Sequence, residues 1–137
     1  MTLKTKVLLS EDMNYNFTKF ENTHGRYEDR ITITGSNSIG FPTKFYKENK
    51  IADYKYVVLY YDNEKKAIGI QFSIDENEPH KFTIIKSKDD YGGSVVVTSF
   101  FKKHDLNSKA YKGKYEWKKV ETPFGELFVF ELREEQT

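Results

Sequence analysis

Short runs of alternating apolar and polar residues recur along the chain, and this two-residue period predicts β-strands. Residues 31–36 read Ile-Thr-Ile-Thr-Gly-Ser and residues 82–87 read Phe-Thr-Ile-Ile-Lys-Ser, each an extended run that leads into a turn. Four further runs pair into two hairpins, because a short polar or Pro/Gly-containing segment separates the members of each pair. These runs are residues 56–61 with 67–72, and 114–120 with 126–132. Residues 127–130 are continuously apolar, which predicts a strand buried on both faces.

Two nine-residue segments, 43–51 and 98–106, share a leading threonine, an aromatic pair, a lysine and a closing aliphatic residue. Their apolar spacing predicts two short helices, with Thr43 and Thr98 as N-caps. Pro42 supports the first boundary, because a proline pushes the residue before it into an extended conformation. Helices this short are not stable alone, so both are expected to pack on the strands.

The matched features follow one another in the same order, which predicts an internal duplication. We therefore expect one domain (residues 1–137) of mainly β, α+β character: a small barrel built from two tandem strand–helix–hairpin repeats. Its parts are an N-terminal extension (1–30), a first repeat (31–72), a linker (73–81), a second repeat (82–132) and a tail (133–137). In the extension, residues 3–9 are a candidate edge strand. Tyr15, Phe17 and Phe20 are expected to pack over the barrel, because such an aromatic cluster should not face only water.

The composition favours an ordered β-rich domain and removes several kinds of site. Ten tyrosines, eleven phenylalanines and one tryptophan favour strands. The absence of cysteine excludes disulfides, thiolate metal sites and cysteine nucleophiles. The apolar run near the first methionine is too short for a signal-peptide core, and no later run is long enough to cross a membrane. These features predict a cytoplasmic protein with no membrane contact.

The first half of the chain has the motif order of a known structural unit. Residues 31–38 supply a strand and a polar turn, residues 39–42 (Ile-Gly-Phe-Pro) an aliphatic-to-proline step, and residues 43–46 the start of a helix. This order resembles the swapped-hairpin unit of the AbrB/MazE-like (cradle-loop barrel) family. The second half resembles it more loosely, with Val97 in place of the proline. Other small duplicated barrels, including double-psi types, show a similar pattern.

The resemblance implies DNA binding, as in the family's transcription regulators and antitoxins. Family members are usually homodimers with one unit per chain, so two fused units would build the equivalent barrel alone. The family's basic positions near the first strand and turn correspond to Arg26, Arg30 and Lys44. The turn at residues 35–38 departs from the pattern because it has no arginine, and the only acidic tail is the short segment 134–137.

Charge is unevenly distributed although the net charge is only +1. Seven lysines and two acidic residues lie between residues 100 and 119, and five glutamates with a single arginine follow from residue 121. Lysines interleaved with aromatic residues are suited to neutralising phosphates and stacking on bases. The candidate nucleic-acid-binding residues are Lys102, Lys103, Lys109, Lys112, Lys114 and Tyr111, with supplementary contacts from Arg26 and Arg30.

Each of these signals has a structural alternative. Tyr115 and Trp117 can alternate into the core while the lysines only solvate the opposite face. The glutamates that follow can pair with the lysines across the last hairpin. The two arginines can form salt bridges with neighbouring carboxylates such as Asp29.

Catalytic and metal-binding motifs are missing from the sequence, so we expect neither an enzyme nor a cofactor. His24, His80 and His104 lack the spacing of metal ligands, and residues 75–78 lack the glycine of a calcium loop and instead resemble a solvated linker. Residues 89–94 contain two adjacent glycines, which predicts a turn. The sequence therefore predicts a non-catalytic nucleic-acid-binding barrel, such as a DNA-binding regulator. The alternative is a protein-interaction module, an accessory or inhibitor subunit without nucleic-acid contact.

Overall fold

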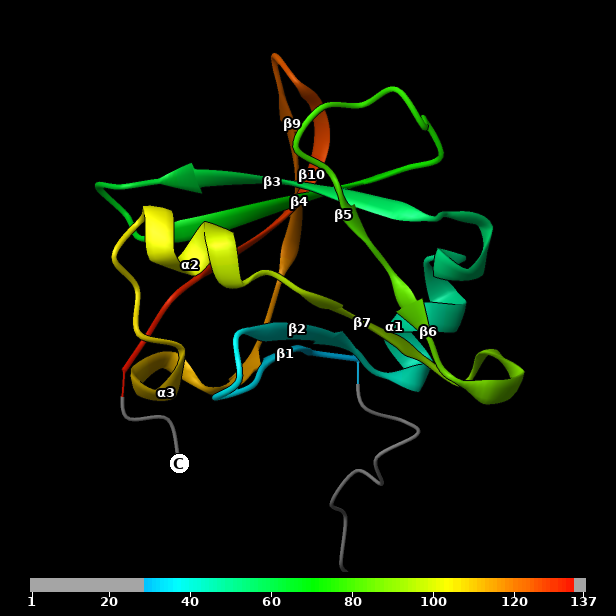
Figure 1. Cartoon of the computed structure of the whole chain (residues 1–137), viewed down its shortest axis with the longest axis horizontal. Helices are drawn as coiled ribbons and strands as arrows, with labels where there is room; N and C mark the ends of the chain where they lie inside the picture. The colour runs from blue at the N-terminus through cyan, green and yellow to red at the C-terminus, as the bar shows by residue number, and fades with distance from the viewer. Residues whose placement is uncertain (1–28, 135–137) are drawn as a thin grey trace, which may run out of the picture.

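The computed structural model describes residues 29–134, which form two five-stranded antiparallel sheets with short helices at both ends (Figure 1). The mainly β, α+β class predicted from the sequence is confirmed. The expected edge strand at residues 3–9, the aromatic cluster of Tyr15, Phe17 and Phe20, and Arg26 lie outside the described residues.

The first sheet, sheet A, has the strand order β6-β7-β2-β1-β8. Its strands are β1 (Ile31–Ile33), β2 (Ser38–Phe41), β6 (Ile85–Lys86), β7 (Gly93–Val96) and β8 (Gly113–Tyr115). At its centre β2 pairs with β7, and Ile39 lies opposite Val95. The centre of the sheet therefore joins the first half of the chain to the second.

Sheet B has the strand order β5-β3-β4-β10-β9. Its strands are β3 (Tyr56–Asp62), β4 (Ala67–Ser73), β5 (Phe82–Thr83), β9 (Lys118–Thr122) and β10 (Gly125–Glu131). The two predicted hairpins are present as β3–β4 and β9–β10. The central pair is again formed between the halves, with Gly69 of β4 opposite Val129 of β10.

Five short helical segments connect the strands within residues 29–134. They are α1 (Thr43–Glu48), the 3-10 turns η3 (Ile51–Asp53) and η4 (Lys88–Asp90), α2 (Thr98–Lys103) and α3 (Ser108–Tyr111). Figure 1 places α1 at one end of the two sheets and both α2 and α3 at the other end. The two predicted helices are therefore present, but each ends three residues earlier than the nine-residue segments suggested. α3 was not predicted.

The expected N-caps are wrong by one residue. Pro42 and Val97 are the cap residues, and Thr43 and Thr98 begin the helices. The Thr43 hydroxyl is directed elsewhere, because it donates a hydrogen bond to the carbonyl of Tyr91 in the loop before β7. Proline is compatible with the N-cap position of α1. Pro42 adopts the extended conformation required there, and the helix does not need the backbone N–H group that proline lacks.

The strands do not close into one continuous barrel, which corrects that part of the sequence prediction. The chain instead bends from one sheet to the other at two corners. Only Ile84 separates β5 from β6, and only Glu116 and Trp117 separate β8 from β9. At the second corner the predicted strand 114–120 is broken, because Trp117 is half-buried and its indole N–H donates to the carbonyl of Asp29 at 2.7 Å. At each corner the chain therefore passes from a strand of one sheet to a strand of the other: from β5 in sheet B to β6 in sheet A, and from β8 in sheet A to β9 in sheet B.

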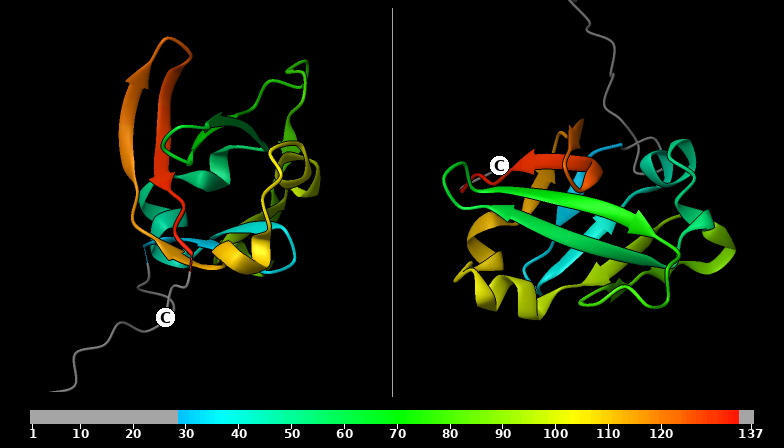
Figure 2. Two further views of the ribbon diagram at one scale, coloured as in Figure 1. Left: turned by 90° about the vertical axis from the view of Figure 1, so that its left-hand side faces the viewer. Right: turned by 90° about the horizontal axis from the view of Figure 1, so that it is seen from above.

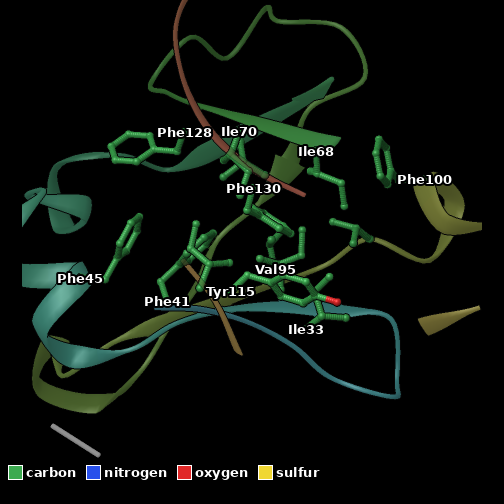
Figure 3. Packing of buried hydrophobic residues seen from close by; sticks show 14 of the residues in the cluster. Ile33, Phe41, Phe45, Ile68, Ile70, Val95, Phe100, Tyr115, Phe128 and Phe130 are labelled. Carbon is green, nitrogen blue, oxygen red and sulfur yellow. The ribbon is translucent and has the colours of Figure 1, made fainter. Parts of the chain in front are cut away.

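The hydrophobic core lies between the two sheets, whose arrangement is seen in Figure 2, and it is rich in aromatic rings (Figure 3). Phe45 of α1 is fully buried and makes edge contacts with Trp117 and Phe128, at centroid distances of 5.1 and 5.4 Å. Burying side chains of this size supplies about 1.5–3 kcal/mol each before the entropy of folding is subtracted.

The predicted core residues Phe45, Ile51, Phe101 and Phe130 belong to this one cluster, and Leu106 packs against it while partly exposed. Val129 is wrong as a core residue, because it faces outward between Phe128 and Phe130. The apolar run 127–130 is nonetheless largely buried on both faces, since Leu127 is covered on the outer side of sheet B.

The adjacent glycines at 92 and 93 serve a packing contact. A methyl group placed on Gly92 would lie 2.9 Å from the backbone carbonyl oxygen of Phe41, closer than any side chain tolerates. Glycine is therefore needed for the loop of β7 to approach the end of β2.

Candidate binding surfaces

The five candidate lysines are gathered at the end of the molecule that carries α2 and α3, here called the basic end (Lys102, Lys103, Lys109, Lys112 and Lys114). Residues 102–114 hold these five lysines against one acidic residue. Two of the lysines occupy the last turn of α2, one lies on α3, one follows it and one lies on β8. All five are exposed.

The turn between β1 and β2 lies beside two of these lysines, Lys109 and Lys112. The Ser108 hydroxyl donates to the carbonyl of Gly35 at 3.1 Å, and the Val97 amide donates to the carbonyl of Asn37 at 2.8 Å. A methyl group on Gly35 would lie 3.5 Å from Cγ of Lys109 and 3.9 Å from Cδ of Lys112. A turn without a charged residue thus shares a surface with lysines more than seventy positions later in the chain.

Four of the five lysines have no acidic partner among the described residues. Within the described part of the chain, Lys102, Lys103, Lys109 and Lys112 form no ion pair within 4.0 Å. The last hairpin instead places Lys118 opposite Val129 and Lys119 opposite Phe128. The alternative that this hairpin pairs glutamates with the lysines is therefore not realised in the described residues.

The aromatic residues among the lysines are internal, which corrects the stacking role expected for Tyr111. Tyr111 is only 6% exposed, and its hydroxyl accepts a hydrogen bond from the ammonium group of Lys66 at 3.1 Å. Tyr115 is 1% exposed, and its hydroxyl donates to the carbonyl of Tyr111 at 2.6 Å. These rings hold β8 against the C-terminal segment and offer no face to a base.

Two of the basic positions implied by the family resemblance, Lys44 and Arg30, do not join the basic end. Lys44 lies on α1 at the opposite end of the molecule and forms an ion pair of 4.0 Å with Glu48. Arg30 directly precedes β1 and is half-buried. Arg26 lies outside the described residues. The structure therefore brings together the five lysines and leaves Arg30 and Lys44 apart from them.

A second surface, which the sequence did not predict, is an apolar groove on the outer face of sheet B. It has a volume of ≈ 390 Å³. Its apolar lining includes Tyr60, Gly69, Val120, Phe124, Leu127 and Val129. Phe124 is 63% exposed and stacks on Tyr60, with ring centroids 4.7 Å apart. Because β9 and β10 carry apolar side chains on their outer face as well, the sequence of residues 127–130 resembles that of a strand buried on both faces.

A small polar cluster lies where the β3–β4 turn meets α2. The His104 ring packs on Tyr61 at a centroid distance of 4.4 Å and on Phe100 at 4.8 Å. Burial lowers the pKa of His104, and the nearby positive charge of Lys103 lowers it further. The hydrogen bond from Lys66 to Tyr111 raises the pKa of that lysine. The cluster is charged and aromatic, but it brings no nucleophile and base together.

Neither metal ligands nor a membrane-spanning helix are found in residues 29–134. No group of three or more histidine, aspartate or glutamate side chains in this range could hold a metal ion. None of the described helices has the length and apolar character needed to cross a membrane. No protein-family model, curated protein or solved structure matches this chain. Proposals on function therefore depend on the two surfaces alone.

Proposed function

We propose that this protein binds nucleic acid through the basic end, without catalysing a reaction. The observation that carries the proposal is that Lys102, Lys103, Lys109 and Lys112, at the end of the molecule that holds α2 and α3, form no ion pair within 4.0 Å among the described residues. A lysine ammonium group with no carboxylate partner is available to a phosphate, and each phosphate neutralised releases counterions from the nucleic acid.

Contacts to the backbone, rather than to bases, are the mode that this surface favours. Its cationic groups are lysines, which act as compact point charges and read phosphate position more than base identity. The β1–β2 turn adds the exposed Ser36 hydroxyl, a neutral donor of the kind that contacts phosphate oxygens. With Tyr111 and Tyr115 buried, base stacking makes no contribution. We expect binding that depends strongly on salt and weakly on sequence.

Internal duplication and an AbrB/MazE-like origin are parts of the same proposal. Both halves run from a hairpin (β1–β2 or β6–β7) through two short helical segments to a second hairpin (β3–β4 or β9–β10). The central pairs β2–β7 and β4–β10 join equivalent strands in antiparallel fashion, as a two-fold relation between the halves requires. A DNA-binding regulator built from two fused units would have this arrangement.

The test is a fluorescence-anisotropy titration with labelled single- and double-stranded DNA and RNA at several salt concentrations. Four neutralised phosphates would give a slope of about −3.6 in log K against log salt for duplex DNA. The Lys102→Ala/Lys103→Ala variant should flatten the slope by up to about two units. The matched control is Lys44→Ala/Lys47→Ala on α1, a helix of the same six-residue length at the opposite end, which should leave the slope unchanged.

The absence of binding to all four nucleic acids at low salt and tens of micromolar protein would overturn the proposal. An equal flattening of the salt slope in both double variants would also contradict the proposal, because it would show a diffuse effect of charge rather than a site at the basic end.

The apolar groove of sheet B favours a second candidate function, a protein-interaction module. An exposed Phe124 beside Tyr60 is the kind of aromatic anchor that dominates protein interfaces. The partner that fits is a polypeptide with an extended apolar segment, because the groove runs along strands β9 and β10. A partner recovered with the wild-type chain but not with Phe124→Ser, and insensitive to nuclease and to Lys102→Ala/Lys103→Ala, would support this function.

A further inference from the structure

The β9–β10 hairpin extends beyond the rest of sheet B as a two-stranded arm. The pairing of β10 with β4 begins at Phe128, opposite Ile70, whereas its pairing with β9 continues to Gly125. Figure 2 shows β9, in orange, as the outermost strand of this arm. Two-stranded hairpins are marginally stable in water, and three or more strands are usually needed. Residues 125–127 of the arm therefore have no third strand paired through the backbone, although side chains of β3 and β4 contact its tip.

The outer edge of β9 is available for such a strand. Among the described residues, β9 pairs only with β10. An unpaired edge presents a row of backbone N–H and C=O groups to any strand that can align with it. Lys118 and Lys119 lie on this edge, and edge lysines discourage pairing with strands that do not supply a negative charge.

One charge relation within the arm is unfavourable in the single chain. Glu121 of β9 lies directly opposite Glu126 of β10. Like charges at directly opposite positions destabilise a strand pair. Neither glutamate has an ion-pair partner within 4.0 Å among the described residues. A positive charge brought to the free side of Glu121 would relieve this repulsion.

We propose that the partner of the β9 edge is the β9 edge of a second copy of this chain. A two-fold axis perpendicular to the sheet places one residue of β9 opposite itself. If the axis passes through Lys119 or Glu121, like charges meet. If it passes through Val120, the two valines face each other and Lys119 lies opposite Glu121 of the partner subunit, twice. Only this register pairs opposite charges.

The resulting dimer would convert two arms into one four-stranded sheet in the order β10-β9-β9-β10. Each Glu121 would then lie between its own Glu126 and the partner's lysine. Because the axis is perpendicular to the sheet, Val120 and the apolar grooves of both copies remain on the same face. The proposal uses β9 and leaves the basic end, formed by α2, α3 and β8, free.

The experiment is a charge exchange measured by sedimentation equilibrium on the full chain. Wild type should form dimers, and Lys119→Glu alone or Glu121→Lys alone should weaken association by about tenfold or more, because both pairs become repulsive. An equimolar mixture of the two single variants should recover a heterodimer, and the double variant K119E/E121K should recover the homodimer. Lys112→Glu, a charge reversal at the basic end, is the matched control and should leave association unchanged.

Thermal unfolding of each variant distinguishes loss of association from loss of folding. The equimolar mixture of the single variants is a second control, because a misfolded variant could not form a heterodimer with the other. Amide hydrogen exchange adds a local readout, because protection of Lys119 and Glu121 should rise with protein concentration. A wild type that stays monomeric up to about 1 mM would overturn the proposal. So would single variants whose mixture fails to associate, or β9 amides whose protection is independent of concentration.

Discussion

Lys50 and Asp105 each follow a short helix and share one unusual backbone conformation. Lys50 follows α1 with φ of 54° and Asp105 follows α2 with φ of 55°, each separated from its helix by one cap residue. The hydrogen bonds agree as well, since the Lys50 amide donates to Lys47 and the Asp105 amide donates to Lys102, both at 3.2 Å. Both helices therefore end in the same left-handed turn.

Glycine at either position should stabilise the protein. The left-handed region costs a residue with a Cβ about 1 kcal/mol, whereas glycine adopts it freely. We expect Lys50→Gly and Asp105→Gly each to raise the free energy of unfolding by up to about 1 kcal/mol in urea titrations. Lys50→Ala and Asp105→Ala remove the same charges without relieving the strain, and a gain as large in these controls would contradict the explanation.

Neighbouring residues of β10 should differ sharply in their contribution to stability. Phe130 is 2% exposed and packs on Tyr115 at a centroid distance of 5.2 Å, while Val129 faces the outer surface. Phe130→Ala should cost about 3–5 kcal/mol because it leaves a cavity in the core. Val129→Ala should cost far less. Comparable losses of melting temperature in the two variants would show that the face assignment of β10 is wrong.

Gly92, directly before β7, and Gly40, within β2, should respond in opposite ways to an added methyl group. Gly92→Ala forces a contact of 2.9 Å with the carbonyl oxygen of Phe41, and backbone atoms cannot move away cheaply, so about 1–3 kcal/mol should be lost. Gly40→Ala meets Cβ of Thr32 at an ordinary 3.6 Å. It should be neutral or stabilising, because alanine has less conformational freedom in the unfolded chain. Chemical denaturation of both variants tests the pair.

The stability of the protein should fall as His104 becomes protonated. Burial against Tyr61 and Phe100, together with the charge of Lys103, lowers the pKa of His104 in the folded protein below its usual 6.5. As the pH falls, His104 therefore takes up a proton in the unfolded chain before it does so in the folded protein. The free energy of unfolding is highest above pH 6.5 and decreases as the pH falls from 6.5 to the lower pKa of the folded protein. His104→Phe keeps a ring against Tyr61 and removes the titration. Melting temperatures between about pH 5 and pH 8 should then decline less in the variant than in wild type. Parallel declines would exclude His104 as the cause.

The sequence predicted the hairpins correctly because their turns are determined locally. Asp62 closes the β3–β4 turn with its own carboxylate, which accepts the amides of Glu64 and Lys65 at 3.0 and 3.2 Å. In the β9–β10 turn Pro123 restricts φ, and Gly125 adopts a φ of 107° that other residues disfavour. Such signals lie within a few residues of the element they define.

The features that sequence reasoning missed depend on contacts between distant segments. The strand predicted at 114–120 breaks because Trp117 turns toward Asp29, almost ninety residues earlier. Tyr111 is buried because Lys66 and the C-terminal segment cover it. Likewise, nothing near Gly35 in the sequence indicates that Lys109 and Lys112 lie beside it. Alternation showed which residues could be buried but not which partner would bury them.

The pairing of β2 with β7 and of β4 with β10 also affects how the chain folds as it is synthesised. Each sheet draws its central pair from both halves, so residues 31–73 cannot complete either sheet when they leave the ribosome. At about 5–20 residues per second, the segment 82–132 takes about 3–10 s to follow. During that interval the apolar faces of β3 and β4 have no partner from the second half, and the first half must wait or be protected by a chaperone. Folding is therefore expected to begin only when β10, the last of the described strands to be translated, becomes available.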